Sequence, residues 1–167
     1  VSVIVMVIYN ARIKKSGRLG NALVSINVAV PFIYGGFAVG NPTWSLAIFA
    51  LLAFLSSLGR EIMKGIVDVS GDIAKGVKSV AATMGNTRAA QESAMLFMAA
   101  VALSALPIAL GLVSNYYIPL VAICDIGFFL TSYSVLTDAS ARNAKRNKNF
   151  VLVWMIFGLL AFVIGAL

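Results

Sequence analysis

The sequence predicts an all-α fold, a bundle of helices that cross a membrane. Of its 167 residues, 60% are hydrophobic and 11% are charged, whereas a soluble domain carries about 25% charged residues. The apolar residues are gathered into stretches about as long as a membrane span, and none alternates polar and apolar residues as a barrel strand would. The connectors between them alternate between short, uncharged ones and long, basic ones. We therefore expect a polytopic transmembrane helical bundle, with residues 1–167 forming a single integral-membrane domain.

The first apolar run, Val1–Ile8, is too short to cross a bilayer, because a spanning helix needs roughly 20 residues. It also lacks the basic start and the cleavage site of a signal peptide. We expect it to be the end of a sixth span whose beginning precedes Val1, so that the domain is N-terminally truncated. Five longer stretches follow, and each is about long enough to span: Ala22–Val39, Trp44–Gly59, Ala94–Val113, Ile118–Leu136 and Phe150–Leu167.

The positive charges fall on one side of this arrangement. All 13 lysines and arginines lie in three long connectors, around residues 12–18, 60–88 and 142–148. By the positive-inside rule that side is cytoplasmic. Topology and attraction to anionic lipid are together a sufficient explanation for the last cluster. They do not explain the middle connector, in which acidic and basic residues are interleaved.

The middle connector carries the most informative polar pattern. Four of the six acidic residues lie between Glu61 and Glu92, and Lys64, Asp68 and Asp72 follow one another at intervals of four. If the helix continues out of the membrane, these three side chains share one face. Two carboxylates one turn apart can supply part of the oxygen shell of Mg²⁺, which water and substrate phosphate then complete.

Basic residues and glycines surround the two aspartates. Phosphate oxygens could be held by Arg60, Lys64, Lys75 and Lys78, and glycines at positions 65, 71 and 76 would let a ligand approach the backbone. The alternative is a helix end with ordinary ion pairs, for example between Lys64 and Asp68. The chain has no histidine and one cysteine, Cys124, so neither a histidine base nor an internal disulfide is available.

This segment resembles the second aspartate-rich motif of the UbiA superfamily of intramembrane prenyltransferases. It reads REIMKGIVDVSGD over residues 60–72 and KGVKS over residues 75–79. Within the superfamily it is most similar to the archaeal branch that makes digeranylgeranylglyceryl phosphate, although Gly65 stands where that branch often has a third aspartate. The segment YNARIKK over residues 9–15 is similar to the family's tyrosine–lysine loop, with a spacing to lysine of five rather than four. A plain basic connector is the alternative explanation of that loop.

The resemblance implies a nine-helix bundle, to which this chain would contribute the end of helix four and helices five to nine. Asp68 and Asp72 would be the catalytic carboxylates that hold Mg²⁺. The implied substrate-binding residues are Arg60, Lys64, Tyr9, Lys14 and Lys78. The family's first aspartate-rich motif is not found in these 167 residues, so we expect this chain alone to be inactive.

The implied reaction is Mg²⁺-dependent transfer of a geranylgeranyl group from its diphosphate to geranylgeranylglyceryl phosphate, in archaeal ether-lipid synthesis. The implied partners are the prenyl diphosphate donor, a lipid-like phosphate acceptor and membrane lipid, with no nucleic acid. The protein would be a multi-pass cell-membrane protein with its active site on the cytoplasmic side. One alternative is a family member with an aromatic or quinone-precursor acceptor.

A second alternative is a transporter or a non-catalytic membrane subunit. A transporter should place ionisable residues along a path through the membrane, and Asp125 is the charged residue that lies deep in a predicted span. We favour a structural role for Asp125, in which it ties two helices together through Ser132 or a tyrosine. Glu92, Asp125 and Asp138, the acidic residues outside the motif, are isolated in the sequence and form no second aspartate-rich segment.

Overall fold

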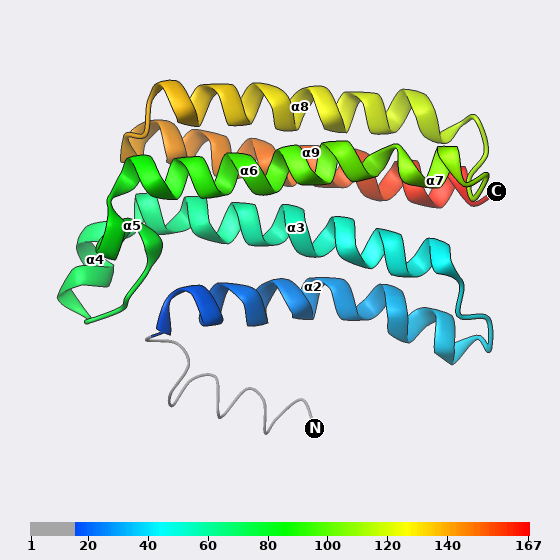
Figure 1. The fold of residues 1–167 in the computed structure, drawn as a ribbon, viewed down its shortest axis with the longest axis horizontal. Coiled ribbons are helices and arrows are strands. Elements are labelled where there is room, and N and C mark those ends of the chain that lie inside the picture. Colours follow the sequence, from blue (N-terminus) through cyan, green and yellow to red (C-terminus); the bar gives the residue numbers. More distant parts are fainter. Residues whose placement is uncertain (1–15) are drawn as a thin grey trace.

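The computed structural model describes residues 16–167, which form an elongated bundle of helices lying along one axis (Figure 1). No strand occurs in this range. The helices follow one another in the order α2 (Arg18–Ala38), α3 (Trp44–Val67), α4 (Val69–Ala74), α5 (Val80–Met84), α6 (Asn86–Ser104), α7 (Leu106–Ala109), α8 (Tyr117–Thr137) and α9 (Ala141–Gly165).

Five helical segments are long and apolar enough to cross a membrane: α2, α3, the α6–α7 segment Asn86–Ala109, α8 and α9. Each contains one of the five predicted stretches or most of it, so the all-α fold class and the five full spans are confirmed. The expected end of a sixth span, Val1–Ile8, lies outside the described residues.

The helices extend further into the basic connectors than the apolar stretches indicated. Helix α3 continues past Gly59 to Val67, α6 begins at Asn86, and α9 begins at Ala141. The side chain of Ser140 caps α9 by accepting a hydrogen bond of 3.2 Å from the backbone nitrogen of Asn143. Lysine and arginine are good helix formers whose charged ends reach the membrane surface, so a helix need not stop where the bilayer does.

The helices pack through small residues. Helix α3 lies between α2 on one side and α6 and α9 on the other, and α8 packs against α6 and α9. At Gly59 on α3, a Cβ atom would lie only 2.8 Å from the ring of Phe97 on α6. The Phe97 ring stacks in turn on Phe128 of α8, with ring centroids 5.1 Å apart. Gly127 makes a similar close approach to Trp154. Such glycine contacts are typical of membrane helices.

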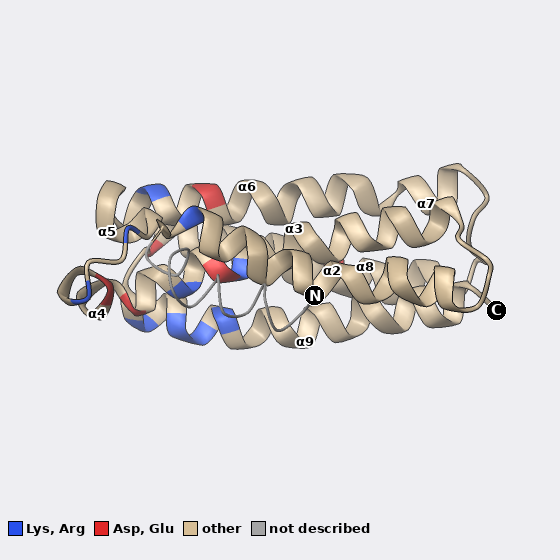
Figure 2. Cartoon of the chain, turned by 90° about the horizontal axis from the view of Figure 1, so that it is seen from below, with Lys and Arg blue, Asp and Glu red and all other residues tan. Residues whose placement is uncertain are grey.

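Apart from Asp125 within α8, the charged side chains gather at one end of the bundle, around α4 and α5 and the adjoining ends of the long helices (Figure 2). We call this the charged end. At the opposite end, the α2–α3 turn at residues 39–43 and the residues 110–116 before α8 carry no charged side chain. Within the described residues, the charged end is therefore the surface on which a site for a charged ligand can be built.

Candidate functional site

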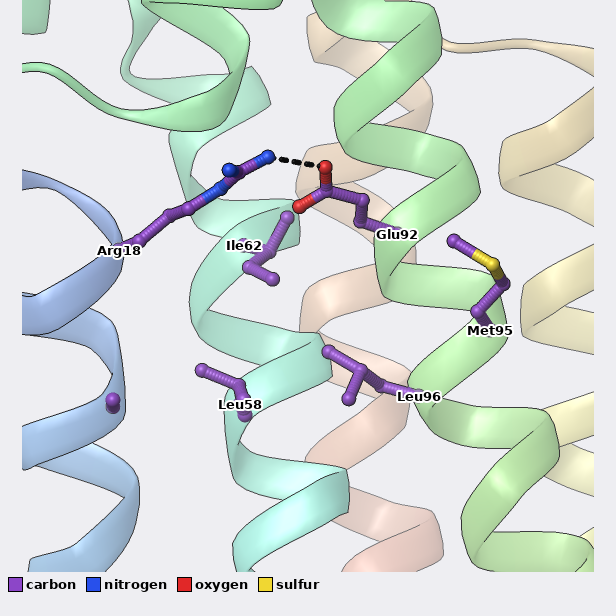
Figure 3. A pocket seen from close by; sticks show the side chains of 7 residues that line it. Arg18, Leu58, Ile62, Glu92, Met95 and Leu96 are labelled. Atoms are coloured by element: carbon purple, nitrogen blue, oxygen red, sulfur yellow. Dashed lines mark hydrogen bonds and ion pairs between the residues drawn. The ribbon is translucent and has the colours of Figure 1, made fainter.

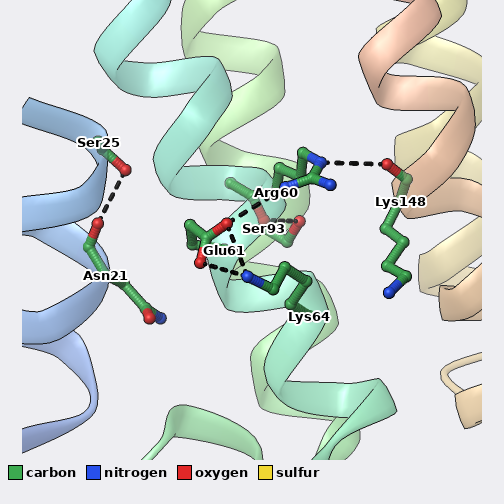
Figure 4. A network of polar contacts seen from close by, with 8 residues as sticks. Asn21, Ser25, Arg60, Glu61, Lys64, Ser93 and Lys148 are labelled. Atoms are coloured by element: carbon green, nitrogen blue, oxygen red, sulfur yellow. Dashed lines mark hydrogen bonds and ion pairs between the residues drawn. The ribbon is translucent and has the colours of Figure 1, made fainter. Parts of the chain in front are cut away.

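The last turns of α3 carry a buried carboxylate between two cations. Glu61 is 9% exposed. It accepts hydrogen bonds from Lys64 Nζ at 2.9 and 3.1 Å and from Arg60 Nη1 at 3.2 Å (Figure 4). A buried carboxylate is stable only when it is paired in this way. Glu61 therefore holds two of the predicted phosphate-binding side chains in place.

Contacts with neighbouring helices keep this part of α3 in position. Arg60 Nε donates a hydrogen bond of 3.2 Å to the backbone oxygen of Lys148 on α9. On the other side, Ser93 Oγ on α6 donates a buried hydrogen bond of 2.8 Å to the backbone oxygen of Gly59. The two predicted cations thus lie on a helix that is joined to both of its neighbours by hydrogen bonds.

The predicted aspartates lie just beyond the end of α3. The chain bends at Asp68, which separates α3 from the short α4 that contains Asp72. Helix α3 thus continues past the apolar stretch, but no unbroken helix runs through Lys64, Asp68 and Asp72. Helical hydrogen bonding nevertheless crosses the bend, from Asp68 N to Lys64 O at 3.0 Å and from Asp72 N to Asp68 O at 2.8 Å. The two aspartates remain one turn apart.

Neither aspartate side chain makes a hydrogen bond or ion pair within residues 16–167. Asp68 is exposed and Asp72 is half-buried. The alternative expectation of an ion pair between Lys64 and Asp68 is wrong, because Lys64 pairs with Glu61. Two free carboxylates suit a hard divalent cation. Among the described residues, no three acidic, cysteine or histidine side chains lie close enough together to hold a metal ion. This pair would therefore supply only part of a metal's coordination shell.

The segment after α4 folds back over the end of α3. Val77 N donates a hydrogen bond of 2.8 Å to the backbone oxygen of Asp72, and Ser79 Cβ lies 3.4 Å from the position of a Cβ at Gly65. Gly65 therefore serves helix packing rather than the predicted ligand approach. A side chain at Gly17 would clash with the backbone oxygen of Lys78. The exposed Lys78 is thus placed beside the start of α2.

Two predicted substrate-binding residues, Tyr9 and Lys14, lie outside the described residues. Of the seven predicted site residues, the structure describes five. They lie in the last turns of α3, at the bend after it, on α4 and in the segment before α5. Glu61 was not among the predicted site residues. The signal that could have revealed it is its i,i+3 spacing to Lys64 in the sequence Arg60-Glu61-Ile62-Met63-Lys64.

A second ion-pair cluster joins α2 to α6. Glu92 pairs with Arg18, and also with Arg88 Nε at 3.5 Å. Beneath the Arg18–Glu92 pair lies an open pocket of about 360 Å³ between α2, α3 and α6, with an apolar wall that includes Leu58 and Met95 (Figure 3).

Asp125 takes part in a chain of hydrogen bonds between α6 and α8. Ser104 Oγ donates to Asp125 Oδ2 at 2.7 Å, and Tyr117 Oη donates to the backbone oxygen of Ser104 at 3.0 Å. The expected tie between two helices is confirmed, although the partner is Ser104 rather than Ser132.

The sequence profile of the UbiA prenyltransferase family matches residues 1–157. Among curated proteins, the chain is 33% identical to a digeranylgeranylglyceryl phosphate synthase of Archaeoglobus fulgidus, covering 95% of this chain and 55% of the relative. It is 32% identical to the protein of the same name from Saccharolobus solfataricus, covering 100% of this chain and 59% of the relative. The chain thus spans little more than half the length of these relatives.

A solved structure is similar to the bundle as a whole. It is described as "Structural and mechanistic insights into the biosynthesis of Digeranylgeranylglyceryl phosphate synthase in membranes", and it is 33% identical to this chain. The two superpose with a TM-score of 0.90 over 95% of this chain and 56% of the other. The likeness therefore extends to the arrangement of the helices.

Proposed function

We propose, from the premise that the chain belongs to the UbiA prenyltransferase family, that the protein transfers a geranylgeranyl group from its diphosphate to geranylgeranylglyceryl phosphate. Residues 1–157 match the family, and five helical segments are suited to spanning a membrane, so this is a multi-pass membrane protein. The acceptor and the place in archaeal ether-lipid synthesis follow from the names of the relatives. We take residues 1–167 as a single integral-membrane domain.

One observation carries the proposal: two aspartates that have no hydrogen bond or ion pair among residues 16–167 lie directly after two cations that a buried glutamate holds in place. Arg60 and Lys64 would bind diphosphate oxygens, and Arg60 could do so with its planar fork of donors. Asp68 and Asp72 would hold Mg²⁺, which, when bound, supplies positive charge that neutralises the leaving diphosphate. The exposed Lys78 lies in the segment that folds back over the same helix end. Tyr9 and Lys14 are included as substrate-binding residues because the segment that contains them resembles the family's tyrosine–lysine loop.

The chemistry requires a site that holds anionic charge and excludes water. The allylic carbon–oxygen bond breaks and its electron pair leaves with the diphosphate; the acceptor oxygen then bonds to that carbon, and the hydroxyl proton is released. Cations placed around the diphosphate stabilise the charge that develops on it. The apolar interior of the bundle would keep water from the allylic cation.

We place the site on the cytoplasmic side of the membrane, because the charged end contains every lysine and arginine of the described residues. Donor and acceptor are both amphiphiles, so each could enter from the bilayer with its phosphate at this surface.

The test is a transfer assay on the full-length protein in liposomes. Geranylgeranyl diphosphate is supplied with either geranylgeranylglyceryl phosphate or 4-hydroxybenzoate, with Mg²⁺ or with EDTA. We expect product with the lipid phosphate and Mg²⁺, and none with EDTA. Product with 4-hydroxybenzoate alone would assign an aromatic acceptor instead. No transfer to either acceptor would contradict the proposal.

A further inference from the structure

A cavity of about 500 Å³ lies inside the bundle between α2, α3, α6, α8 and α9, which is within the usual size range of small-molecule sites. On α3 its wall is formed by Phe49, Leu52, Ala53 and Ser56. Arg60 follows Ser56 at a spacing of four, which places it on the same face of the helix, one turn nearer the charged end. The cavity therefore begins directly beneath the proposed diphosphate site.

On α9, too, the cavity wall begins one turn from the proposed diphosphate site. The wall there runs from Leu152 to Phe162, and Leu152 lies one turn beyond Lys148, whose backbone oxygen accepts the hydrogen bond from Arg60. The Arg60–Lys148 contact thus joins two of the five helices that line the cavity, at its charged end.

Aromatic rings line the other end of the cavity. Four helices contribute one ring each, which together we call the aromatic floor: Phe32, Phe49, Tyr117 and Phe162. The ring centroids of Phe49 and Phe162 are 4.1 Å apart, those of Phe49 and Tyr117 are 5.9 Å apart, and those of Phe32 and Phe162 are 5.7 Å apart. All four lie towards the uncharged ends of their helices.

The chain of hydrogen bonds that contains Asp125 holds one ring of the aromatic floor, Tyr117, in place. Tyr117 is 1% exposed, and its hydroxyl is held by the backbone oxygen of Ser104, whose own hydroxyl is held by Asp125. Gly165 of α9 lies against the other side of Tyr117, where a Cβ would come within 2.9 Å of the Tyr117 Cβ. The ring therefore has little freedom to move aside.

We propose, on the basis of the function proposed above, that this cavity receives the prenyl chain of the donor and that the aromatic floor sets the longest chain that fits. At 1.5 Å per helical residue, Phe49 lies about 16 Å from Arg60 and about 22 Å from Lys64 along α3. The carbon backbone of an extended geranylgeranyl chain is about 20 Å long at ordinary bond lengths. A donor longer by one isoprene unit has to displace a ring of the floor.

The test compares donors of 15, 20 and 25 carbons in the full-length protein in liposomes, as ratios of kcat/KM. We expect the wild-type protein to use the 25-carbon donor at least tenfold less well than the 20-carbon donor. Phe49→Ala should raise the 25-to-20 ratio by about tenfold, and Phe49→Leu, a smaller change that preserves folding, should raise it to a lesser degree. The matched control is Phe129→Ala, since Phe129 is on α8, 56% exposed and away from the cavity.

Asp125 is tested as a positioning residue by the same ratio. Asp125→Asn keeps an acceptor for Ser104 and should leave the ratio unchanged, whereas Asp125→Leu should raise it. The proposal is overturned if folded Phe49→Ala and Phe49→Leu proteins keep the wild-type ratio, or if Phe129→Ala shifts it equally. Absence of any transfer by the wild-type protein would instead contradict the proposed function, so the two failures are distinguishable.

Discussion

Glu61 connects the packing of α3 to its proposed chemistry. Its carboxylate is buried, while the side chains of its partners Arg60 and Lys64 are 22% and 37% exposed. The two cations can therefore reach a ligand at the surface while their positions are set from within the bundle. A hydrogen bond to a charged group is worth about 1.5–3 kcal/mol, so the arrangement also contributes to stability.

We expect Glu61→Gln to weaken donor binding about tenfold, because the cations lose the charge that orients them. The thermal midpoint should fall by several degrees, since about 1 kcal/mol corresponds to a shift of roughly 2–4 °C for a chain of this size. Binding of a non-hydrolysable prenyl diphosphate and thermal unfolding would be measured on the same preparation.

Glu92→Gln is the matched control, because Glu92 also pairs with two arginines, but these are Arg18 and Arg88 and not the proposed diphosphate-binding Arg60. It should lower the thermal midpoint without changing donor binding. Equal loss of donor binding in both variants would show that Glu61 acts only through stability.

Residue spacing in the sequence predicted the pair of aspartates in the candidate site, but it did not predict the ion pairs between distant helices. Asp68 and Asp72 could be identified because carboxylates one helical turn apart are visible in a sequence. The pairing of Glu92 with Arg18 could not, because these residues are 74 positions apart in the sequence and meet only through the packing of α2 near α6.

At the level of the helices, the apolar stretches predicted where each span lies but not where each helix ends. Hydropathy marks the apolar stretches, and helices α3, α6 and α9 continue past them into segments that carry charged residues. The bend at Asp68 was also not predicted, because residues 64–72 contain no proline to mark it.

Close packing of α3 against α6 predicts that Gly59→Ala destabilises the protein. The new Cβ would lie 2.8 Å from the Phe97 ring, which is fully buried and stacked on Phe128 and so cannot turn away. Overpacking of this kind costs about 1–3 kcal/mol. Thermal unfolding should show a lower midpoint.

The control for this change is Gly35→Ala on α2, where nothing lies within 4 Å of the new Cβ among the described residues. Alanine is a better helix former than glycine by about 1 kcal/mol, so the midpoint should stay the same or rise. A Gly59→Ala protein as stable as the Gly35→Ala protein would contradict the packing described for α3 and α6.

On the scale of the whole molecule, the separation of a charged end from an uncharged end predicts the orientation in the membrane. The one cysteine of residues 1–167, Cys124, is buried, so single cysteines can be introduced as reporters. In intact cells, a membrane-impermeant maleimide should label Asn41→Cys at the uncharged end but not Arg142→Cys at the charged end. Arg142→Cys should be labelled after permeabilisation. The reverse pattern would contradict the cytoplasmic placement of the site.

The central claim is that Asp68 and Asp72 form a metal and diphosphate site at the end of α3. Its most direct test is Mg²⁺-dependent binding of a non-hydrolysable geranylgeranyl diphosphate analogue to the full-length protein. We expect Mg²⁺ to strengthen binding to the wild-type protein and to an Asp138→Asn control, in which the altered side chain caps the start of α9 through Ser140. In the Asp68→Asn, Asp72→Asn double variant, the dependence on Mg²⁺ should disappear while the thermal midpoint remains near that of the wild type. Undiminished Mg²⁺-dependent binding by the folded double variant would contradict the claim.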